Sequence, residues 1–298
     1  MGISRKVGIL GGTALRKLEG LKVTREFLFD TKFFGEVWVI EGTLEGREVV
    51  LIPRHGRFHE HLPSETNYVG NLVTLRLLGV TDVFAVSAMG GLAKGYDPMS
   101  LVFVDVTTDK TSGRHSTIFG DGVAGHIARP TAVCPELHSV LVKAAVSIGV
   151  PHKTHGDIVV INGPPFSSER ESKINRREGH HVVGMTNEPE AKLARELGLH
   201  YAIIGQITDP DNPPTGTAHA VTQQEVTGTF AKMGTLASVV IREAFNHPRF
   251  MGTPTCSCSN ALQGAILTDP RGIGPVGRER LCHIFQVEEI PPEWFAKH

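Results

Sequence analysis

The 298-residue sequence lacks a long apolar segment and an excess of charge of either sign. No stretch approaches the ~20 consecutive apolar residues of a membrane-spanning helix. Thirty Lys and Arg against 31 Asp and Glu give a formal net charge of −1. That balance argues against bulk electrostatic binding to nucleic acid or to an anionic membrane, but it is compatible with a local basic pocket. We therefore expect a small-molecule partner, and neither a nucleic acid nor a membrane.

Cysteine is also scarce, and the N-terminus lacks a targeting signal. Four cysteines in a chain of this length do not form a disulfide scaffold. The first residues have neither the apolar core nor the cleavage site of a signal peptide. Lys6 stands where an N-myristoylation sequence requires Ser or Thr. These absences predict a soluble, cytoplasmic protein.

Short apolar runs alternate with amphipathic stretches along the chain. We expect buried strands at 6–10, 83–86, 101–104, 158–161 and 201–204, and a hairpin from 37–40 and 49–52. We expect helices at 66–78 (with Ser64 as its cap), 136–148, 188–197, 222–245 and 259–267, and surface loops at 209–217 and 269–277. This alternation predicts an α/β fold. It is a single domain over residues 1–298, in which helices flank a mixed, largely parallel sheet and a helical tail begins at about residue 250.

The residues after successive strands share a chemical theme. In open α/β sheets the ligand site lies at the carboxyl ends of the strands. Hydroxyls of Thr13, Ser87 and Thr186, together with the guanidinium of Arg54, suit a phosphate-sized anion. Asp209 and Asp211 point the same way on an extended segment, which suits a heterocycle that presents several nitrogens on one edge. Each piece alone has a plainer interpretation as turn chemistry, so their joint placement carries the prediction.

The order of these pieces resembles a known family. The chain is similar to the methylthioadenosine phosphorylase branch of the trimeric purine nucleoside phosphorylases over about residues 6–250, on the motifs GILGGT (8–13), RHG (54–56), GPPFSS (163–168), GMTNEPE (184–190) and TDPD (208–211). The resemblance implies a nucleoside phosphorylase-like fold and phosphorolysis of S-methyl-5′-thioadenosine to adenine and 5-methylthioribose 1-phosphate. It also implies a homotrimer, with phosphate as a co-substrate and no metal or organic cofactor.

The resemblance also implies a role for each matched position. Phosphate would lie against Thr13, Arg54, His55, Ser87, Ala88 and Thr186. The nucleoside would contact Met185 beneath the ribose, Phe166 at the base, Asp209 at N7, Asp211 towards the 6-amino group, Val226 in the thioether pocket, and His126 lent by a neighbouring subunit. Glu190 matches a family position near the purine site, and no role is assigned to it.

The chemistry of the reaction agrees with these roles. Cleavage of an N-glycosidic bond develops positive charge on the sugar and negative charge on the leaving base. A phosphate anion stabilises the first charge and supplies the nucleophile. The second charge needs a proton donor at N7, and Asp209 can serve as this catalytic acid only if apolar surroundings, such as Phe166 and Val226, raise its pKa.

Three departures from the family pattern leave alternatives open. Pro165 stands where the family usually has Arg, Asn187 and Glu188 replace the usual Thr-Val, and Gln223 occupies an expected apolar position. They bear on the 5′ substituent and the turnover rate more than on the reaction class. One alternative is a purine nucleoside phosphorylase of other or broader specificity. The other is a nucleoside-binding scaffold with little turnover.

Histidine and cysteine spacings raise a separate question of metal binding. His55, His59 and His61 are spaced as metal ligands can be, but we interpret them as loop histidines, with His55 serving the anion. For Cys256-Ser257-Cys258, with Cys282-His283 later, free thiols, a short-range disulfide and a zinc site all remain open. We expect no metal. Cys134, before Pro135, is expected to be a buried, inert thiol, and the basic helical face of Arg170, Lys173, Arg176 and Arg177 is expected to be solvated.

Overall fold

The computed structural model describes residues 5–12, 18–212 and 222–296, and its centre is a sheet that forks at one long strand. The strands are β1 (Lys6–Gly11), β2 (Lys22–Asp30), β3 (Glu36–Leu44), β4 (Arg47–Pro53), β5 (Val80–Gly91), β6 (Leu101–Val104), β7 (Val106–Asp109), β8 (His152–Lys153), β9 (Asp157–Val160), β10 (Val182–Gly184) and β11 (His200–Pro210). One path runs β2-β3-β4-β1-β5-β10-β9-β7, and β11, β6 and β8 branch from β5. Six pairings are parallel and four antiparallel, so the predicted mixed, largely parallel sheet is confirmed.

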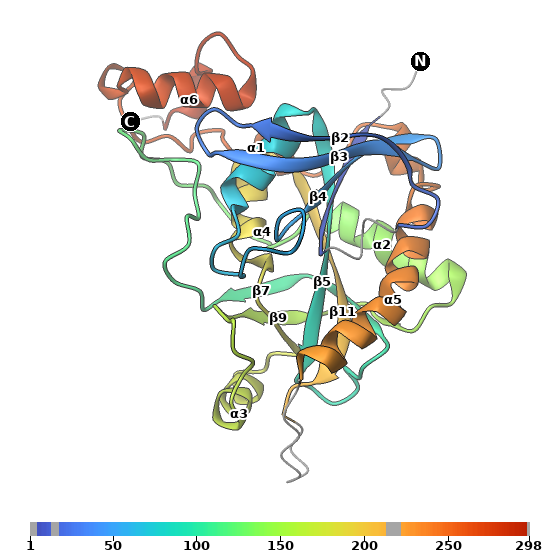
Figure 1. Cartoon of the computed structure of the whole chain (residues 1–298). Coiled ribbons are helices and arrows are strands. Elements are labelled where there is room, and N and C mark those ends of the chain that lie inside the picture. Colours follow the sequence, from blue (N-terminus) through green and yellow to red (C-terminus); the bar gives the residue numbers. More distant parts are fainter. Residues whose placement is uncertain (1–4, 13–17, 213–221, 297–298) are drawn as a thin grey trace.

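Helices cover both faces of this sheet (Figure 1). They are α1 (Tyr68–Leu77), α2 (Pro135–Ile148), α3 (Glu169–Arg177), α4 (Asn187–Glu196), α5 (Gln223–Ala244) and α6 (Pro275–Phe285). One apolar core lies between the sheet and α1, α4 and α6, and a second lies between the sheet and the pair α2 and α5. None of the helices in the described ranges combines the length and apolarity that a membrane crossing requires.

Two central strands are longer than their apolar runs suggested. β5 continues past Val86 to Gly91, and β11 continues past Ile204 to Pro210. Parallel pairing between the two strands extends to Gly91 and Pro210. Small residues at the end of β5 allow this close approach, because a Cβ atom added to Gly90 would lie only 3.0 Å from the Cβ atom of Asp211. Ser87, Ala88 and Asp209 therefore lie within strands. The expectation that they follow strand ends was wrong, as was the surface-loop assignment at 209–210; residues 213–217 of that loop lie outside the described ranges.

The helix predictions were closest where capping signals are strong. α2 ends at Gly149, which takes the left-handed conformation at φ 68° that a glycine adopts without strain. α1 begins two residues later than predicted, because Asn67 and not Ser64 caps it: the Asn67 side chain accepts from the backbone N–H of Gly70 at 2.9 Å. The edge strand β2 was not predicted, since its residues are mostly exposed and its only apolar run is the short segment 27–29.

The C-terminal predictions were wrong in position. Residues 259–267 form turns, with a 3₁₀ turn at Cys258–Asn260 and Gly264 at φ 66°, instead of a helix. The last helix is α6, which starts at Pro275 inside the predicted 269–277 loop. Proline suits the first helical turn, and the apolar side chains of Leu281 and Ile284 are buried, which explains why the helix forms there.

Candidate active site

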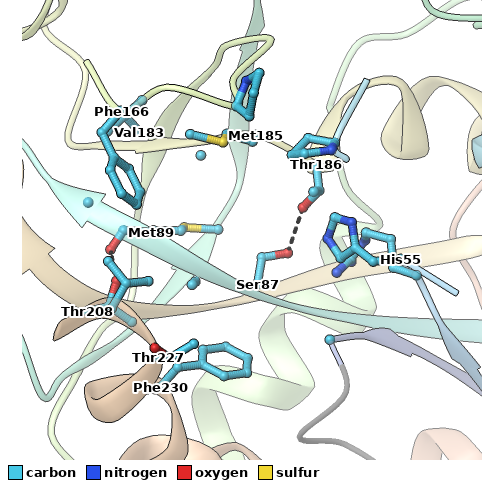
Figure 2. Close-up of a pocket in the computed structure, with 18 of the residues that line it drawn as sticks. His55, Ser87, Met89, Phe166, Val183, Met185, Thr186, Thr208, Thr227 and Phe230 are labelled. Atoms are coloured by element: carbon cyan, nitrogen blue, oxygen red, sulfur yellow. Dashed lines mark hydrogen bonds between the residues drawn. The ribbon is translucent and has the colours of Figure 1, made fainter. Parts of the chain in front are cut away.

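A cavity of about 410 Å³ opens at the carboxyl ends of β4, β10 and β11 and beside β5 (Figure 2). Ten of the predicted site residues line it: Arg54, His55, Ser87, Ala88, Phe166, Met185, Thr186, Asp209, Asp211 and Val226. The predicted Thr13 lies outside the described residues. The predicted His126 lies elsewhere in this chain, exposed, with its backbone N–H bonded to the carbonyl of Ala265 at 2.8 Å.

Hydroxyl groups gather at one end of the cavity. Ser87 Oγ and Thr186 Oγ1 lie 3.2 Å apart, although 99 residues separate them in the chain (Figure 2). Asn187 donates from Nδ2 to Ser87 Oγ at 3.3 Å and also to Tyr201 Oη at 3.3 Å. Because both hydroxyls are buried yet border the cavity, they can donate to an anion there.

Arg54 enters this end of the cavity as part of a buried ion pair. It is 2% exposed, and its Nε and Nη2 both donate to the carboxylate of Glu190, while Nη1 donates to the carbonyl of Val86 at 3.1 Å. Burial opposes the charge, but Glu190 outweighs it and raises the pKa of Arg54. Three of the five guanidinium N–H donors are thus used, and two remain that no other described residue accepts. Tyr201 also donates to Glu190, at 2.8 Å. Glu190, to which the sequence assigned no role, therefore orients the guanidinium of Arg54.

His55 is held as a neutral ring beside Arg54. Burial, reinforced by the positive charge of Arg54 and by His59, lowers the pKa of His55 to about 3. Its Nδ1 lies 3.0 Å from the carbonyl of His61, and its ring stacks on His59 with centroids 4.6 Å apart. With Nδ1–H donating to that carbonyl, Nε2 is the acceptor nitrogen. A neutral His55 can therefore accept a hydrogen bond through Nε2 from a protonated phosphate oxygen.

Two carboxyl groups border the other end of the cavity. A bulge in β11 lets both reach it: Ile207 pairs with Met89 and Asp209 with Gly90, so Thr208 is the additional residue. Thr208 donates from Oγ1 to Asp209 Oδ1 at 2.7 Å, and Asp209 is only 8% exposed. Bulges next to ligand sites re-aim side chains, and nothing in the sequence pattern signalled this one.

Two residues of α3 hold Asp211 in place by hydrogen bonds. Ser172 donates to its Oδ2 at 2.5 Å, and Arg176 donates to its backbone carbonyl and to that of Asn212. Burial raises the pKa of the Asp211 carboxyl, against the opposing effect of the Ser172 hydrogen bond. Arg176 also donates to the carbonyl of Leu92 at 3.0 Å, so the prediction of a wholly solvated basic face was wrong for this residue.

Apolar side chains form the walls between the two ends. In Figure 2 Phe166 and Met185 lie on one side of the cavity, and Thr227 and Phe230, from α5, lie on the other. Sequence reasoning missed Phe230, yet it lies four residues after the predicted Val226, the spacing that shares a helix face. It also missed Met89 and Val183, which line the cavity from strands.

The protein shares its family with enzymes of known activity. The Phosphorylase superfamily profile matches residues 6–246. The S-methyl-5′-thioadenosine phosphorylase of Chloroflexus aurantiacus is 37% identical over 286 residues, covering 94% of this chain and 97% of the relative. That of Geobacter sulfurreducens is 36% identical, covering 92% of this chain and 96% of the relative.

Solved structures give the same result. A methylthioadenosine phosphorylase from an antarctic soil metagenomic library superimposes with a TM-score of 0.83 at 31% identity, covering 94% of this chain and 99% of that chain. A variant of the adenosine/methylthioadenosine phosphorylase of Schistosoma mansoni, in complex with methylthioadenosine, gives a TM-score of 0.75 at 32% identity. It covers 80% of this chain and 90% of the other.

Proposed function

The chain belongs to the phosphorylase superfamily, and from that premise we propose that it is a pentosyltransferase that cleaves S-methyl-5′-thioadenosine with phosphate. The products are adenine and 5-methylthioribose 1-phosphate. The observation that carries the proposal is the division of one cavity into a hydroxyl- and arginine-lined end and a carboxyl-lined end. Relatives that this chain covers almost completely have the same activity by name.

The hydroxyl- and arginine-lined end suits the phosphate. Ser87, Thr186 and Arg54 offer donors from three separate segments that line the same cavity, and two hydrogen bonds to Glu190 fix the guanidinium of Arg54. Phosphate bound there approaches the anomeric carbon as the nucleophile and stabilises the positive charge that develops on the sugar.

The carboxyl-lined end suits the purine. Asp209 donates a proton or a strong hydrogen bond to N7 as the bond to the sugar breaks, and Asp211 accepts from the 6-amino group. Phe166 and Phe230 offer apolar rings to the base and the thioribose, and such walls keep water from the reacting carbon. A carboxylate at position 209 favours 6-aminopurines over 6-oxopurines.

The proposal is tested by measuring adenine release from S-methyl-5′-thioadenosine with and without phosphate. We expect release that depends on phosphate and saturates with it. Binding without release would support a nucleoside-binding scaffold, and faster turnover of inosine or guanosine would support a purine nucleoside phosphorylase of other specificity. Either result would contradict the proposal.

We also propose that the enzyme is a homotrimer that needs no metal for catalysis and serves purine salvage in the cytoplasm. His126 is exposed on a segment without helix or strand and is absent from its own chain's cavity, which suits donation to a neighbour. A threefold ring with heterologous contacts lets each subunit give one such residue and receive another. Light scattering should give three times the chain mass, and His126→Ala should raise KM for the nucleoside more than KM for phosphate. A fully active monomer would contradict the arrangement.

A further inference from the structure

At the start of β11, on the far side of the molecule from the cavity, four ligand-type side chains converge. They are Cys134, His200, Cys256 and Cys258, and their ligand atoms all lie within 4.8 Å of one another. No other such group of three or more occurs within the described ranges. The sequence had suggested Cys282 and His283 as partners of the Cys-x-Cys pair, but both lie on α6, where Cys282 contacts the carbonyl of Glu288 and His283 the ring of Phe33.

From this cluster we propose that the protein binds one structural zinc ion through three thiolates and one imidazole. Four ligands arranged tetrahedrally at about 2.3 Å (Zn–S) and about 2.1 Å (Zn–N) stand roughly 3.4 to 3.8 Å from one another. Cys134 Sγ lies 3.5 Å from Cys256 Sγ and 3.6 Å from His200 Nδ1. Cys256 Sγ lies 3.1 Å from the same nitrogen. The group is thus preorganised for a tetrahedral ion, and sulfur-rich donor sets favour zinc over calcium or magnesium.

Two features of the surroundings stabilise the negative charge that a zinc ion with three thiolates carries. Cys134 is the N-cap of α2, and its Sγ accepts from the backbone N–H of Leu137 at 3.4 Å, at the helix end that stabilises negative charge. The guanidinium of Arg249 is nearby: it donates to Asp82 at 2.7 Å and to Glu136, and its buried Nε has no partner among the described residues. A zinc ion with three thiolates carries a net charge of −1, which a buried arginine compensates.

The ligands come from three segments that are distant in the chain. The backbone N–H of Cys134 bonds to the carbonyl of Tyr201 at 2.8 Å, which holds the N-terminus of α2 against the start of β11. Glu136 accepts from the backbone of Thr255 at 2.8 Å, and Arg195 donates to the carbonyl of Ser257 at 3.4 Å. The Cys-x-Cys segment is therefore already placed by hydrogen bonds from outside it. A metal at this junction ties the segment after residue 250 to the sheet.

The position and burial of the ligands indicate a structural and not a catalytic site. His200 and Asp209 lie at opposite ends of β11, about 30 Å apart along an extended strand. Cys134, His200 and Cys258 are at most 5% exposed. Four protein ligands fill the tetrahedron and leave no position for substrate or water, which is the arrangement of structural zinc sites. Binding of zinc to three cysteines releases their protons to solvent and changes no oxidation state.

The test measures the metal content of the full chain, produced without a metal-affinity tag and purified with a reductant and without chelators. Elemental analysis should find about one zinc per chain in the wild type. Cys258→Ser and His200→Ala should each lose at least about nine-tenths of the zinc, because tight binding needs all four protein ligands and each variant removes one. Cys282→Ser, at a thiol outside the cluster, should retain all of it.

A second measurement uses only the wild-type chain and so does not depend on whether the variants fold. The protein is stripped of metal under reducing conditions and titrated with Co²⁺, then with Zn²⁺. We expect the visible absorption of tetrahedral cobalt–thiolate coordination to appear, to saturate at about one equivalent and to disappear as zinc displaces cobalt. Absence of zinc together with absence of this absorption, or zinc content unchanged in both ligand variants, would overturn the proposal. A Cys256–Cys258 disulfide that persists in cells and excludes metal would also overturn it.

Discussion

The two ends of β11 differ in their surroundings: one borders an open cavity and the other a closed cluster of side chains. At its carboxyl end, Asp209 borders an open cavity, and polar groups from several strands face a space large enough for a nucleoside and phosphate. At its amino end, His200 meets three cysteines whose ligand atoms lie within 4.8 Å of each other, with no space between them for an organic ligand. The difference shows how one strand can separate a site that must exchange its contents from one that holds the chain together.

Helix α4 runs beside β11 and shows the same contrast in its carboxylates. Glu190, in its first turn, faces the buried guanidinium of Arg54. Glu196, at its last residue, accepts from the hydroxyl of Thr117 at 2.9 Å and from the backbone N–H of Ile118 at 2.7 Å, and it forms no ion pair with any residue that the structure describes. Burial therefore raises the pKa of Glu196 to about 7, whereas each of the two carboxylates in the first turn, Glu188 and Glu190, pairs with an arginine. A buried carboxylate on this helix is thus neutralised in one of two ways: by an arginine at the cavity end, or by a bound proton at the opposite end.

The largest effect is expected from Asp209→Asn, which removes the acid at the cavity end of β11 while keeping its shape. Adenine release from S-methyl-5′-thioadenosine should fall on the order of a hundredfold or more, because an amide cannot supply a proton to N7. Activity on 6-oxopurine nucleosides is expected to rise somewhat. Asp97→Asn makes the same chemical change at an exposed position outside the cavity and should have no effect on either activity. A variant at position 209 as fast as wild type would remove the assignment of the acid.

Arg54→Lys tests whether the hydroxyl- and arginine-lined end of the cavity binds phosphate. Lysine keeps a positive charge near Glu190. It loses the planar guanidinium, which donates to Glu190 through two nitrogens and still has N–H groups left for a ligand in the cavity. We expect KM for phosphate to rise roughly ten- to a hundredfold, with a much smaller change in KM for the nucleoside. Arg25→Lys, at a side chain 61% exposed, is the matched control. Equal changes in both KM values would indicate a general disturbance of the fold instead of a phosphate contact.

Glu196→Gln tests the carboxylate at the other end of α4, and its effect is on stability. Its pKa is raised from 4.5 to about 7 in the folded protein, so between these values the folded state keeps a proton that the unfolded chain gives up. Stability should therefore fall as pH rises through that window, by up to about 3 kcal/mol at 1.36 kcal/mol per pKa unit.

Unfolding by urea at pH 5 and pH 8 measures this dependence. Glu196→Gln should remove most of it, because the amide cannot ionise, whereas Glu289→Gln, at an exposed position, should leave it intact. A variant at position 196 with the full pH dependence of wild type would show that another group is responsible.

Local sequence signals sufficed where the chain itself determines the structure. The apolar run at 101–104 is the strand β6 without change, and helix α2 was placed by its periodicity, its proline start and its terminal glycine. Residues such as Thr186 and Met185 were predicted to share one site because strands place them at one sheet edge, and the resemblance named their roles. Ten of these residues do line one cavity.

Features that depend on distant contacts were beyond sequence reasoning. The bulge at Thr208 arises from the register between β5 and β11, and the partners of the Cys-x-Cys pair come from residues 134 and 200, which no spacing rule connects to it. The pairing of Arg54 with Glu190 spans 136 residues. Such features exist only once the sheet is assembled, and local pattern carries no record of them.

Phosphate is identified as the nucleophile most directly by following the oxygen that replaces the base on the sugar. The wild-type enzyme is incubated with S-methyl-5′-thioadenosine and unlabelled phosphate in water labelled with heavy oxygen, and the sugar product is analysed by mass spectrometry. We expect a 5-methylthioribose 1-phosphate that carries no label at the anomeric oxygen, because phosphate held by Arg54, Ser87 and Thr186 is the nucleophile. A free, labelled 5-methylthioribose as the first product would mean that water attacks instead, and would contradict it.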